Sequence, residues 1–459
     1  MSDALFTPPF PPPFASKLGK VRRFVVGMNS WIHVLFEKSY KMKMGEARSP
    51  GLHIYLANEL DLIDQIMSQP KLYPKHTEMV EALSPLIGNS LLIANGDEWE
   101  EQRAMVGPAF QLTALARTLP MMVAAADELI ARVDALIDAS PGRPIDIDPL
   151  MTHVAADVIF RALFSVPLDT AGSLTIHRAF NRYQRFAQAK MTMRIYRLPT
   201  FGLLARSRST ARAIHKVFEP IVRERYERFH ADGTVAHDDI LQSLFAAKRP
   251  GTGTPFTYQE VMEQVQNTFL AGHETTASLM AWALYLLGEC PAIQERVRAE
   301  VDAVAGDAPF TGAALREMRT VRNVMRETLR LYPPVPFLPR EVQCPVQMRD
   351  KHLEPGAMLV VSPWLVQRHS DNWTCPHAFD PDRFDRPEDQ ERVKDSYIPF
   401  GKGPRTCTGA GFAQQEAMIV IAAMTRRYRI AALPGDKPEP VGRITLRARR
   451  GLRLKLERR

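Results

Sequence analysis

The apolar positions of this chain recur with a helical period over most of its length. Between Thr113 and about Leu244, apolar residues return every three or four positions among alanines and arginines, which predicts a mainly helical stretch. Pro199-Thr200-Phe201-Gly202 interrupts this pattern and predicts a loop. The expected fold class is therefore mainly α.

The longest predicted helix covers residues 257–290. Thr257-Tyr258-Gln259-Glu260 matches a capping box, in which the side chains of Thr257 and Glu260 satisfy free backbone amides at the start of a helix. Pro291 marks the end, because proline cannot continue a helix. Because each residue of an α-helix advances the chain by about 1.5 Å, about 33 residues give a helix roughly 50 Å long. Such a helix is long enough to cross the whole molecule.

Strand patterns are fewer and lie mostly in the second half of the chain. His53-Ile54-Tyr55-Leu56 predicts one short strand, and further strand patterns follow Pro333. In the tail, apolar residues alternate with mostly basic ones on either side of Gly451, which predicts a two-stranded hairpin with a solvated basic face. The apolar positions of this hairpin are Ile444, Leu446, Ala448, Leu452, Leu454 and Leu456.

No repeat and no flexible linker divides the chain between Thr257 and Cys407. We therefore expect a single large domain over residues 1–459, mainly α with a small β lobe. Residues 1–20 are rich in proline, which predicts an extended lead-in that packs on the surface.

Composition and charge narrow the class of protein. Over 459 residues, 45% are hydrophobic and 24% are charged, which is typical of a globular protein. The four cysteines have no disulfide or zinc spacing, so a reducing, cytoplasmic compartment is expected. No uninterrupted apolar run is long enough for a transmembrane anchor. The net charge of +8 permits an acidic partner, but the basic residues are scattered, so no nucleic-acid partner is expected.

The strongest chemical signal is a glycine-rich loop with one cysteine, Cys407, directly before an apolar helix; loop and helix together cover residues 398–424. A helix N-terminus stabilises a thiolate. Gly403 and Gly409 permit backbone angles closed to other residues, so the loop can press against a flat cofactor. Arg405 supplies a cation for an anionic group at the cofactor's edge. A lone cysteine among glycines is more often a small buried hydrophobe, but this arrangement suits a ligand of haem iron.

A second signal lies in the middle of the long helix, at Ala271-Gly272-His273-Glu274-Thr275-Thr276. Glycine inside a helix costs about 1 kcal/mol, so Gly272 needs a reason. One reason is close helix packing, and the other is that Ala271 and Gly272 let the helix approach a flat cofactor. In the second case Thr275 bonds a nearby carbonyl and leaves a niche for dioxygen and water. Glu274 then provides an acid beside a hydroxyl for proton delivery.

The cysteine loop resembles the haem-binding signature of the cytochrome P-450 family, F-x-x-G-x-R-x-C-x-G. Every fixed position is filled, and the one departure is Thr408, where the family usually has an apolar residue. The signature residues are Phe400, Gly403, Arg405, Cys407 and Gly409. The long helix matches the family's A/G-G-x-D/E-T motif, which implies that Thr275 activates oxygen and that Glu274 is its neighbouring acid.

Three further matches follow the family's order along the chain. Glu327 and Arg330 fill an E-x-x-R motif, and Arg383 fills the place of the arginine that pairs with it; the resemblance implies a buried, structural network. Taken alone, such a pair usually marks a solvated helix surface. Trp99 and Arg103, and separately Arg340, match positions that bind haem propionates in the family. Taken alone, Trp99 and Arg103 indicate only a half-buried ring and a solvated cation.

The resemblance spans essentially the whole chain and implies a soluble bacterial haem-thiolate monooxygenase with the family's triangular fold. The enzyme would insert one oxygen atom from O2 into a fatty acid, terpenoid or alkyl-aromatic substrate. Its cofactor would be haem b, iron protoporphyrin IX, with the Cys407 thiolate as axial ligand. No flavin- or iron–sulfur-binding pattern is present, so electrons from NAD(P)H would arrive through a ferredoxin or flavodoxin and its reductase. Lys402 and Arg405 flank the side where such a partner would bind, and a monomer is expected.

Family position also implies an apolar substrate pocket. Its expected walls are Val80, Leu83, Leu86, Ile93, Phe186, Phe269, Val335, Phe337, Leu338 and Ile444. Two other functions remain open. A peroxide-driven or rearranging haem-thiolate enzyme commonly lacks the acid–threonine pair, and a non-enzymatic haem-binding sensor has no use for it.

Overall fold

The computed structural model describes residues 5–16, 19–200, 202–233 and 237–459. Helices form most of it, which confirms the mainly α fold class with a small β part. The helices are α1 (Lys20–Gly27), α2 (Leu60–Ser68), α3 (Thr77–Ile87), α4 (Gly96–Val106), α5 (Leu112–Ala139), α6 (Asp148–Phe164), α7 (Thr170–Ile195), α8 (Leu203–Asp232), α9 (Ile240–Ala246), α10 (Tyr258–Glu289), α11 (Pro291–Val304), α12 (Gly312–Glu317), α13 (Arg319–Leu331), α14 (Pro363–Val366), α15 (Gln390–Ser396) and α16 (Ala410–Arg427).

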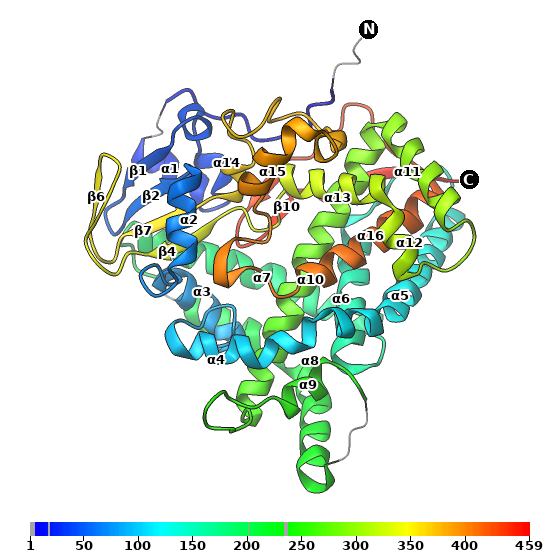
Figure 1. The fold of residues 1–459 in the computed structure, drawn as a ribbon, viewed down its shortest axis with the longest axis horizontal. Coiled ribbons are helices and arrows are strands. Elements are labelled where there is room, and N and C mark those ends of the chain that lie inside the picture. The colour runs from blue at the N-terminus through cyan, green and yellow to red at the C-terminus, as the bar shows by residue number, and fades with distance from the viewer. Residues whose placement is uncertain (1–4, 17–18, 201, 234–236) are drawn as a thin grey trace.

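The strands lie mostly at one side of the molecule and the long helices fill the rest (Figure 1). The strands are β1 (Met44–Arg48), β2 (His53–Ala57), β3 (Ile145–Asp146), β4 (Leu338–Glu341), β5 (Val346–Met348), β6 (Lys351–Leu353), β7 (Met358–Val361), β8 (Tyr428–Ala432), β9 (Pro440–Gly442), β10 (Leu446–Ala448) and β11 (Arg453–Arg458). The largest sheet has the order β1-β2-β7-β4, in which only the β2–β7 pair is parallel. It holds Arg340 of β4 opposite Leu359 of β7.

Helix α10 forms the centre of the core and is buried on most of its surface. The predicted capping box is present: the backbone N–H of Thr257 donates to the Glu260 carboxylate at 2.8 Å, and the backbone N–H of Glu260 donates to Thr257 Oγ1 at 3.3 Å. Cys290 caps the other end, and Pro291 begins α11. In Figure 1, α10 runs through the middle of the molecule. It is therefore the element around which a central site can be built.

Close packing explains the glycine in α10. A Cβ built on Gly272 would lie only 2.9 Å from Cγ1 of Ile159 on α6, a separation that real Cβ atoms do not show. Of the two reasons considered for this glycine, the structure therefore supports helix packing. Approach of Gly272 to a flat cofactor is not needed to explain it.

The predicted C-terminal hairpin around Gly451 is wrong. Strand β10 pairs with β9, and β11 lies between β3 and β8, so both edges of β11 already have partners. The alternating pattern identified the strands but could not identify the strands they pair with. The basic face is not fully solvated either, because Arg447 points inward and its side chain is only 13% exposed.

The proline-rich lead-in packs along the surface as an extended segment. The backbone N–H of Phe379 donates to Phe6 O at 2.8 Å, and the Tyr332 hydroxyl donates to Pro9 O at 2.7 Å. The Phe10 ring stacks on His377 with centroids 4.5 Å apart. Residues 1–4 and 17–18 of the lead-in, and Phe201 of the predicted loop, lie outside the described residues.

Within the described ranges, no helix on its own is both long and apolar enough to cross a bilayer, and two bent helix pairs meet that test only when joined.

Candidate functional site

Cys407 lies in a tight loop that requires glycine at two positions. Gly401 and Gly403 have φ of 76° and 74°, in the left-handed region that favours glycine. A Cβ on Gly403 would also lie 2.3 Å from the backbone oxygen of Met67, so the loop is pressed against α2. The loop closes when the backbone N–H of Cys407 donates to Phe400 O at 3.0 Å.

Gly409 does not need the special backbone angles that the sequence suggested. Its φ is −86°, which any residue adopts, and it is the N-cap of α16. Its contribution is a backbone N–H close to the Cys407 sulfur. Burial raises the pKa of the Cys407 thiol, while the N–H of Gly409 and the Arg103 guanidinium both lower it. Burial has the larger effect, so the pKa of the thiol lies above its ordinary value, and the Gly409 N–H and Arg103 are the two groups here that favour the thiolate.

Cys407 opens into the interior of the protein. Its side chain is exposed, yet it is surrounded by enough protein for burial to perturb its pKa. Ala271 is likewise exposed and Thr275 is half-buried, although α10 is a core helix. Thr275 Oγ1 donates to the Ala271 backbone oxygen at 2.7 Å, the type of bond predicted for it. The site thus offers a thiol from the loop and a hydroxyl from α10 to interior space.

Four cations from separate segments gather near the loop: Lys75, Arg103, Arg340 and Arg405. Lys75 pairs in backbone register with Arg340 of β4, and its Nζ donates to Leu91 O at 2.8 Å and Ala94 O at 3.0 Å. Arg103 Nη1 donates to Thr406 O at 2.7 Å. The Arg405 guanidinium lies 4.7 Å from the centroid of the Trp99 ring, and Arg405 also donates to Asn95 Oδ1 at 2.8 Å.

This cation cluster has no salt-bridged counter-ions. Among the described residues, none of its members forms a salt bridge with a carboxylate, and Glu100 is the acid whose charge acts on Arg405. Burial and the neighbouring arginines hold the pKa of Lys75 well below its ordinary value. Burial, followed by the charge of Arg405, lowers the pKa of Arg340 to about 10. Burial also lowers the pKa of Arg405 to about 10, although the charge of Glu100 acts in the opposite direction. Cations destabilised in this way favour bound anions, and the two propionates of haem fit that requirement beside Cys407.

Lys75 was not identified from the sequence, and neither was Asn95. Lys75 belongs to no motif and stands only two residues before α3 begins. In the sequence, Lys75 is only a lysine in a short segment between two predicted helices. Its role in the cation cluster becomes visible only in the structure, where pairing with β4 places Lys75 beside Arg340.

The structure brings Glu327, Arg330 and Arg383 together in a buried network. Arg330 Nε and Nη2 donate to the two Glu327 oxygens at 2.7 and 2.8 Å, and Arg383 Nε donates to Glu327 Oε1 at 3.0 Å. All three side chains are at most 1% exposed. Arg330 also donates to the backbone oxygens of Gln367, Pro376 and Ala378. The network therefore ties α13 to the segment that leads to the cysteine loop.

Glu274 is placed differently from its neighbour Thr275. Its side chain is 1% exposed and forms an ion pair with Arg447, whose Nη2 lies 3.0 Å from Glu274 Oε2. Burial alone would raise the pKa of this carboxyl, but Arg447 and His273 outweigh burial and hold it below the ordinary value. The predicted proton donor is thus an ion-paired carboxylate. The sequence could not show this, because Arg447 lies in a distant strand.

The expected pocket walls divide into two groups. Leu83, Leu86, Ile93 and Phe269 are closed off in the core, and Phe269 packs on Phe218 with centroids 5.0 Å apart. The partly exposed group is Val80, Phe186, Val335, Phe337, Leu338 and Ile444. Only the second group has surface to offer a substrate.

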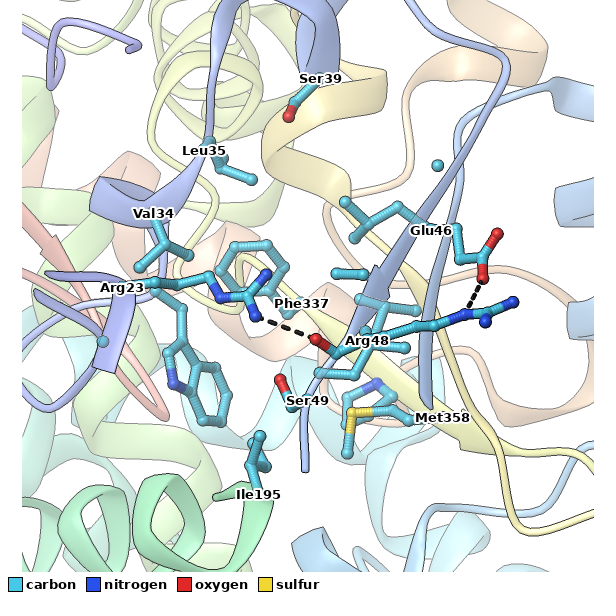
Figure 2. A pocket seen from close by; sticks show the side chains of 18 of the residues that line it. Arg23, Val34, Leu35, Ser39, Glu46, Arg48, Ser49, Ile195, Phe337 and Met358 are labelled. Atoms are coloured by element: carbon cyan, nitrogen blue, oxygen red, sulfur yellow. Dashed lines mark hydrogen bonds and ion pairs between the residues drawn. The ribbon is translucent and has the colours of Figure 1, made fainter. Parts of the chain in front are cut away.

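Phe337 also lines a cavity of about 700 Å³ that the sequence did not reveal. Its walls come from α1, the first strands of the main sheet and the end of α7. Figure 2 shows Arg23 at this cavity, where its guanidinium donates to the backbone oxygen of Arg48 at 3.0 Å. The lining is mostly apolar, including Val34, Ile195 and Met358.

Comparisons with known proteins agree with this site. The family model for Cytochrome P450 matches residues 9–453. Cyclooctatin synthase of Streptomyces melanosporofaciens is 30% identical over 86% of this chain and 84% of its own length. Cyclooctat-9-en-7-ol 5-monooxygenase of the same organism is 31% identical over 86% and 83%. Pentalenene oxygenase of Streptomyces avermitilis is 29% identical over 88% and 87%. Because the family model covers nearly the whole chain and the loop, the cation cluster and α10 all fit haem, the chain belongs to the cytochrome P450 family.

Proposed function

We propose that this protein is a haem-thiolate monooxygenase that inserts one oxygen atom from O2 into a hydrophobic substrate. The observation that carries the proposal is the combination of a thiol opening into the interior with a buried cation cluster that has no salt-bridged counter-ions. A terpenoid is the substrate class we favour. Two of the similar proteins are named for acting on cyclooctat-9-en-7-ol and on pentalenene, and the partly exposed pocket residues are apolar.

Each part of the site has a role in this proposal. Cys407 would supply the thiolate that binds the iron of haem b, and Trp99, Arg103, Arg340 and Arg405, together with Lys75, would bind its propionates. Phe400, Gly403 and Gly409 would shape the loop beside the cofactor, and Ala271 would leave room for it next to α10, while Gly272 lets α10 pack against Ile159 of α6. When bound, haem supplies the oxygen-activating chemistry. Thr275 would hold a proton at its Oγ1 for delivery, and Glu274 would be the acid that replenishes this proton after leaving its ion pair with Arg447.

Electrons from NAD(P)H are proposed to reach the haem through a separate ferredoxin or flavodoxin with its reductase. The net charge of +8 favours an acidic partner of this kind. Lys402 contributes less than the sequence suggested, because its ammonium already forms ion pairs with Asp64 and Asp395. We further propose a soluble, monomeric bacterial enzyme of the cytoplasm, on the basis of cysteine spacing and of similarity to bacterial proteins.

Cysteine substitutions test the central assignment. The ferrous carbonyl complex of the purified protein is expected to show the long-wavelength Soret band of thiolate-ligated haem. Cys407→His should abolish this band while haem remains bound, and Cys375→Ser, which changes an exposed cysteine, should leave it intact. Loss of the band in Cys375→Ser and not in Cys407→His would overturn the assignment.

A reconstituted redox chain separates the proposed activity from its alternatives. A monooxygenase converts NADPH and O2 into hydroxylated product in matched amounts when a terpenoid substrate is present. A peroxide-driven enzyme would form product with peroxide alone and without the redox proteins. A haem-binding sensor would form no product under either condition.

A further inference from the structure

Asn267 continues the side of α10 that faces the interior space beside Cys407. Ala271 and Thr275 open into that space, and Asn267 stands one turn before Ala271, so the three side chains follow one another along one side of the helix. Asn267 keeps an exposure of 6%, whereas its neighbour Gln266 keeps 2%. A polar side chain therefore lies at the edge of the space that a substrate would enter.

The side-chain amide of Asn267 has an unused hydrogen-bonding atom. Its Oδ1 is buried and has no partner among the described residues. A buried acceptor without a partner costs free energy, so such groups normally have one. Thr268, the next residue, has the same small exposure and adds a hydroxyl beside the amide. An amide can accept a hydrogen bond through its oxygen and donate one through its nitrogen.

The segment before α4 lies against α10 directly beyond Asn267. One turn earlier on α10, Glu263 accepts a hydrogen bond from the backbone N–H of Asn89 at 3.0 Å. The next residue, Gln264, accepts one from the backbone N–H of Leu91 at 3.4 Å. These contacts close the helix surface beyond Asn267, so a ligand that lies along α10 ends at this amide.

The charges near Asn267 disfavour an anionic ligand. The charged residues of α10 within two turns of Asn267 are all acids, namely Glu260, Glu263 and Glu274. The Glu274 carboxylate already has Arg447 as its counter-ion. A carboxylate buried beside these acids would be repelled and would lose its hydration. A hydroxyl or carbonyl group is neutral and needs only the hydrogen bond that the amide offers.

The distance between Asn267 and Thr275 sets the size of a fitting ligand. The two residues are eight positions apart on one helix, which corresponds to about 12 Å. In the proposed function, the reacting end of the substrate lies near Thr275. The skeletons of sesquiterpenoids and diterpenoids are long enough to reach from this end to Asn267.

We propose that Asn267 determines specificity by binding a hydroxyl or carbonyl oxygen of the substrate, which is therefore a terpenoid that already carries oxygen. A hydrocarbon of the same skeleton leaves the amide unpaired. An earlier reaction must supply the oxygen of this substrate, such as a hydroxylation or the capture of water during cyclisation. The inference rests on the proposed function, because it names the substrate class of the same site.

Binding of matched ligands to the haem-loaded protein tests the proposal. The probes are cedrol and cedrane, a tricyclic alcohol and the hydrocarbon of its skeleton, together with dodecanol, dodecane and dodecanoate. The change of the Soret band during titration gives each Kd. The wild type should bind each alcohol more tightly than its hydrocarbon, and dodecanol more tightly than dodecanoate. In Asn267→Leu, the ratio that expresses preference for the alcohol should fall by on the order of tenfold, because the hydroxyl is then buried unpaired.

Gln266→Leu is the matched control. Gln266 is also a buried amide of α10 without a partner among the described residues. It stands one turn before Phe269 and two turns before His273, which contact Phe218 of α8 and Phe180 of α7, so it faces away from the interior space. Gln266→Leu should keep the wild-type preference for the alcohol. Asn267→Val makes the same chemical change with a smaller side chain and serves if Asn267→Leu does not fold.

Three results would overturn the role of Asn267. One is a wild type in which neither alcohol binds more tightly than its hydrocarbon, including one that binds no alcohol. The second is an equal change of preference in Asn267→Leu and Gln266→Leu, or no change in Asn267→Leu. The third is tighter binding of dodecanoate than of dodecanol, which would mean that the site takes an anion.

The same samples separate this proposal from the proposed function. A wild-type protein without the thiolate Soret band in its ferrous carbonyl complex contradicts the haem-thiolate assignment. A normal band without a preference for the alcohols contradicts the role of Asn267 alone.

Discussion

Glu416 is a buried acid without a partner. It lies on α16, nine positions after Cys407, and neither carboxylate oxygen has a hydrogen-bond partner among the described residues. Burial raises its pKa well above the ordinary value, so the group is neutral in the folded protein. In the sequence, Glu416 is one polar residue within an apolar helix, and the sequence does not distinguish it from a solvated glutamate.

The pH dependence of stability should reveal this acid. The folded state keeps the Glu416 proton above the pH at which the unfolded chain releases it, so wild-type stability falls as pH rises through this window. The loss amounts to about 1.4 kcal/mol for each pH unit. Glu416→Gln cannot ionise. Urea unfolding at about pH 5 and pH 8 should therefore show that its stability relative to wild type improves with pH.

Glu295→Gln is the control for this experiment. Glu295 is exposed, and its contact with Arg298 lowers its pKa. The stability of Glu295→Gln relative to wild type should therefore not improve as pH rises. A Glu416→Gln variant whose stability difference from wild type does not change with pH would show that Glu416 is ionised in the fold.

At the residue scale, the sequence identified groups whose role depends on close neighbours. Cys407 and Gly403 could be chosen because the loop between them is short and its geometry is local. The environment of Glu274 could not be predicted, because its counter-ion Arg447 lies 173 positions away in the chain. The same holds for Lys75, which becomes part of the cation cluster only through pairing with β4.

At the scale of elements, the ends of helices could be predicted from the sequence, but the pairing of strands could not. The capping box and Pro291 fixed the ends of α10, because caps involve residues three or four positions apart. The tail strands formed at about the predicted places but paired with β3, β8 and β9 instead of with each other. Alternation specifies the faces of a strand and says nothing about which strand lies beside it.

The network that joins α13 to the segment before the cysteine loop should dominate local stability. Glu327→Ala leaves Arg330 and Arg383 buried without their counter-ion, and breaking a buried pair in this way costs about 3–5 kcal/mol. We expect a large drop in the urea unfolding midpoint and poor haem loading. Asp382→Ala is the matched control, because Asp382 adjoins Arg383 but pairs with Arg296 on the surface at 2.6 Å.

The exposed pair of Asp382 and Arg296 should contribute no more than about 1 kcal/mol. Both variants remove one carboxylate from an ion pair with arginine, and they differ in burial. If Glu327→Ala and Asp382→Ala lowered the unfolding midpoint equally, the buried network would not be the structural support described above.

At the scale of the whole molecule, the two ends of the chain are held to distant segments. Residues 6–10 contact Tyr332 and the stretch around Phe379, more than 320 positions later in the case of Pro9 and Tyr332. The fold class could be predicted because helical periodicity is a local property. That the lead-in packs on the surface could also be predicted, but not the segment it covers, since polyproline-like sequence has no pairing preference of its own.

The N-terminal segment of residues 6–10, a strap across the surface, should be held in place mainly by Phe10. Its ring stacks on His377 with an interplanar angle of 7°, and burial together with Arg368 and Arg330 lowers the pKa of His377 to about 4, so the imidazole is neutral at physiological pH. Phe10→Ala removes a half-buried ring worth up to about 2 kcal/mol. The strap should then detach more often, and hydrogen exchange at the Phe379 amide, which donates to Phe6 O, should accelerate.

Pro12→Ala is the control for this experiment, because it changes an exposed position and should leave the exchange rate of the Phe379 amide as it is. An unchanged Phe379 rate in Phe10→Ala would mean that the strap is held by its backbone bonds alone.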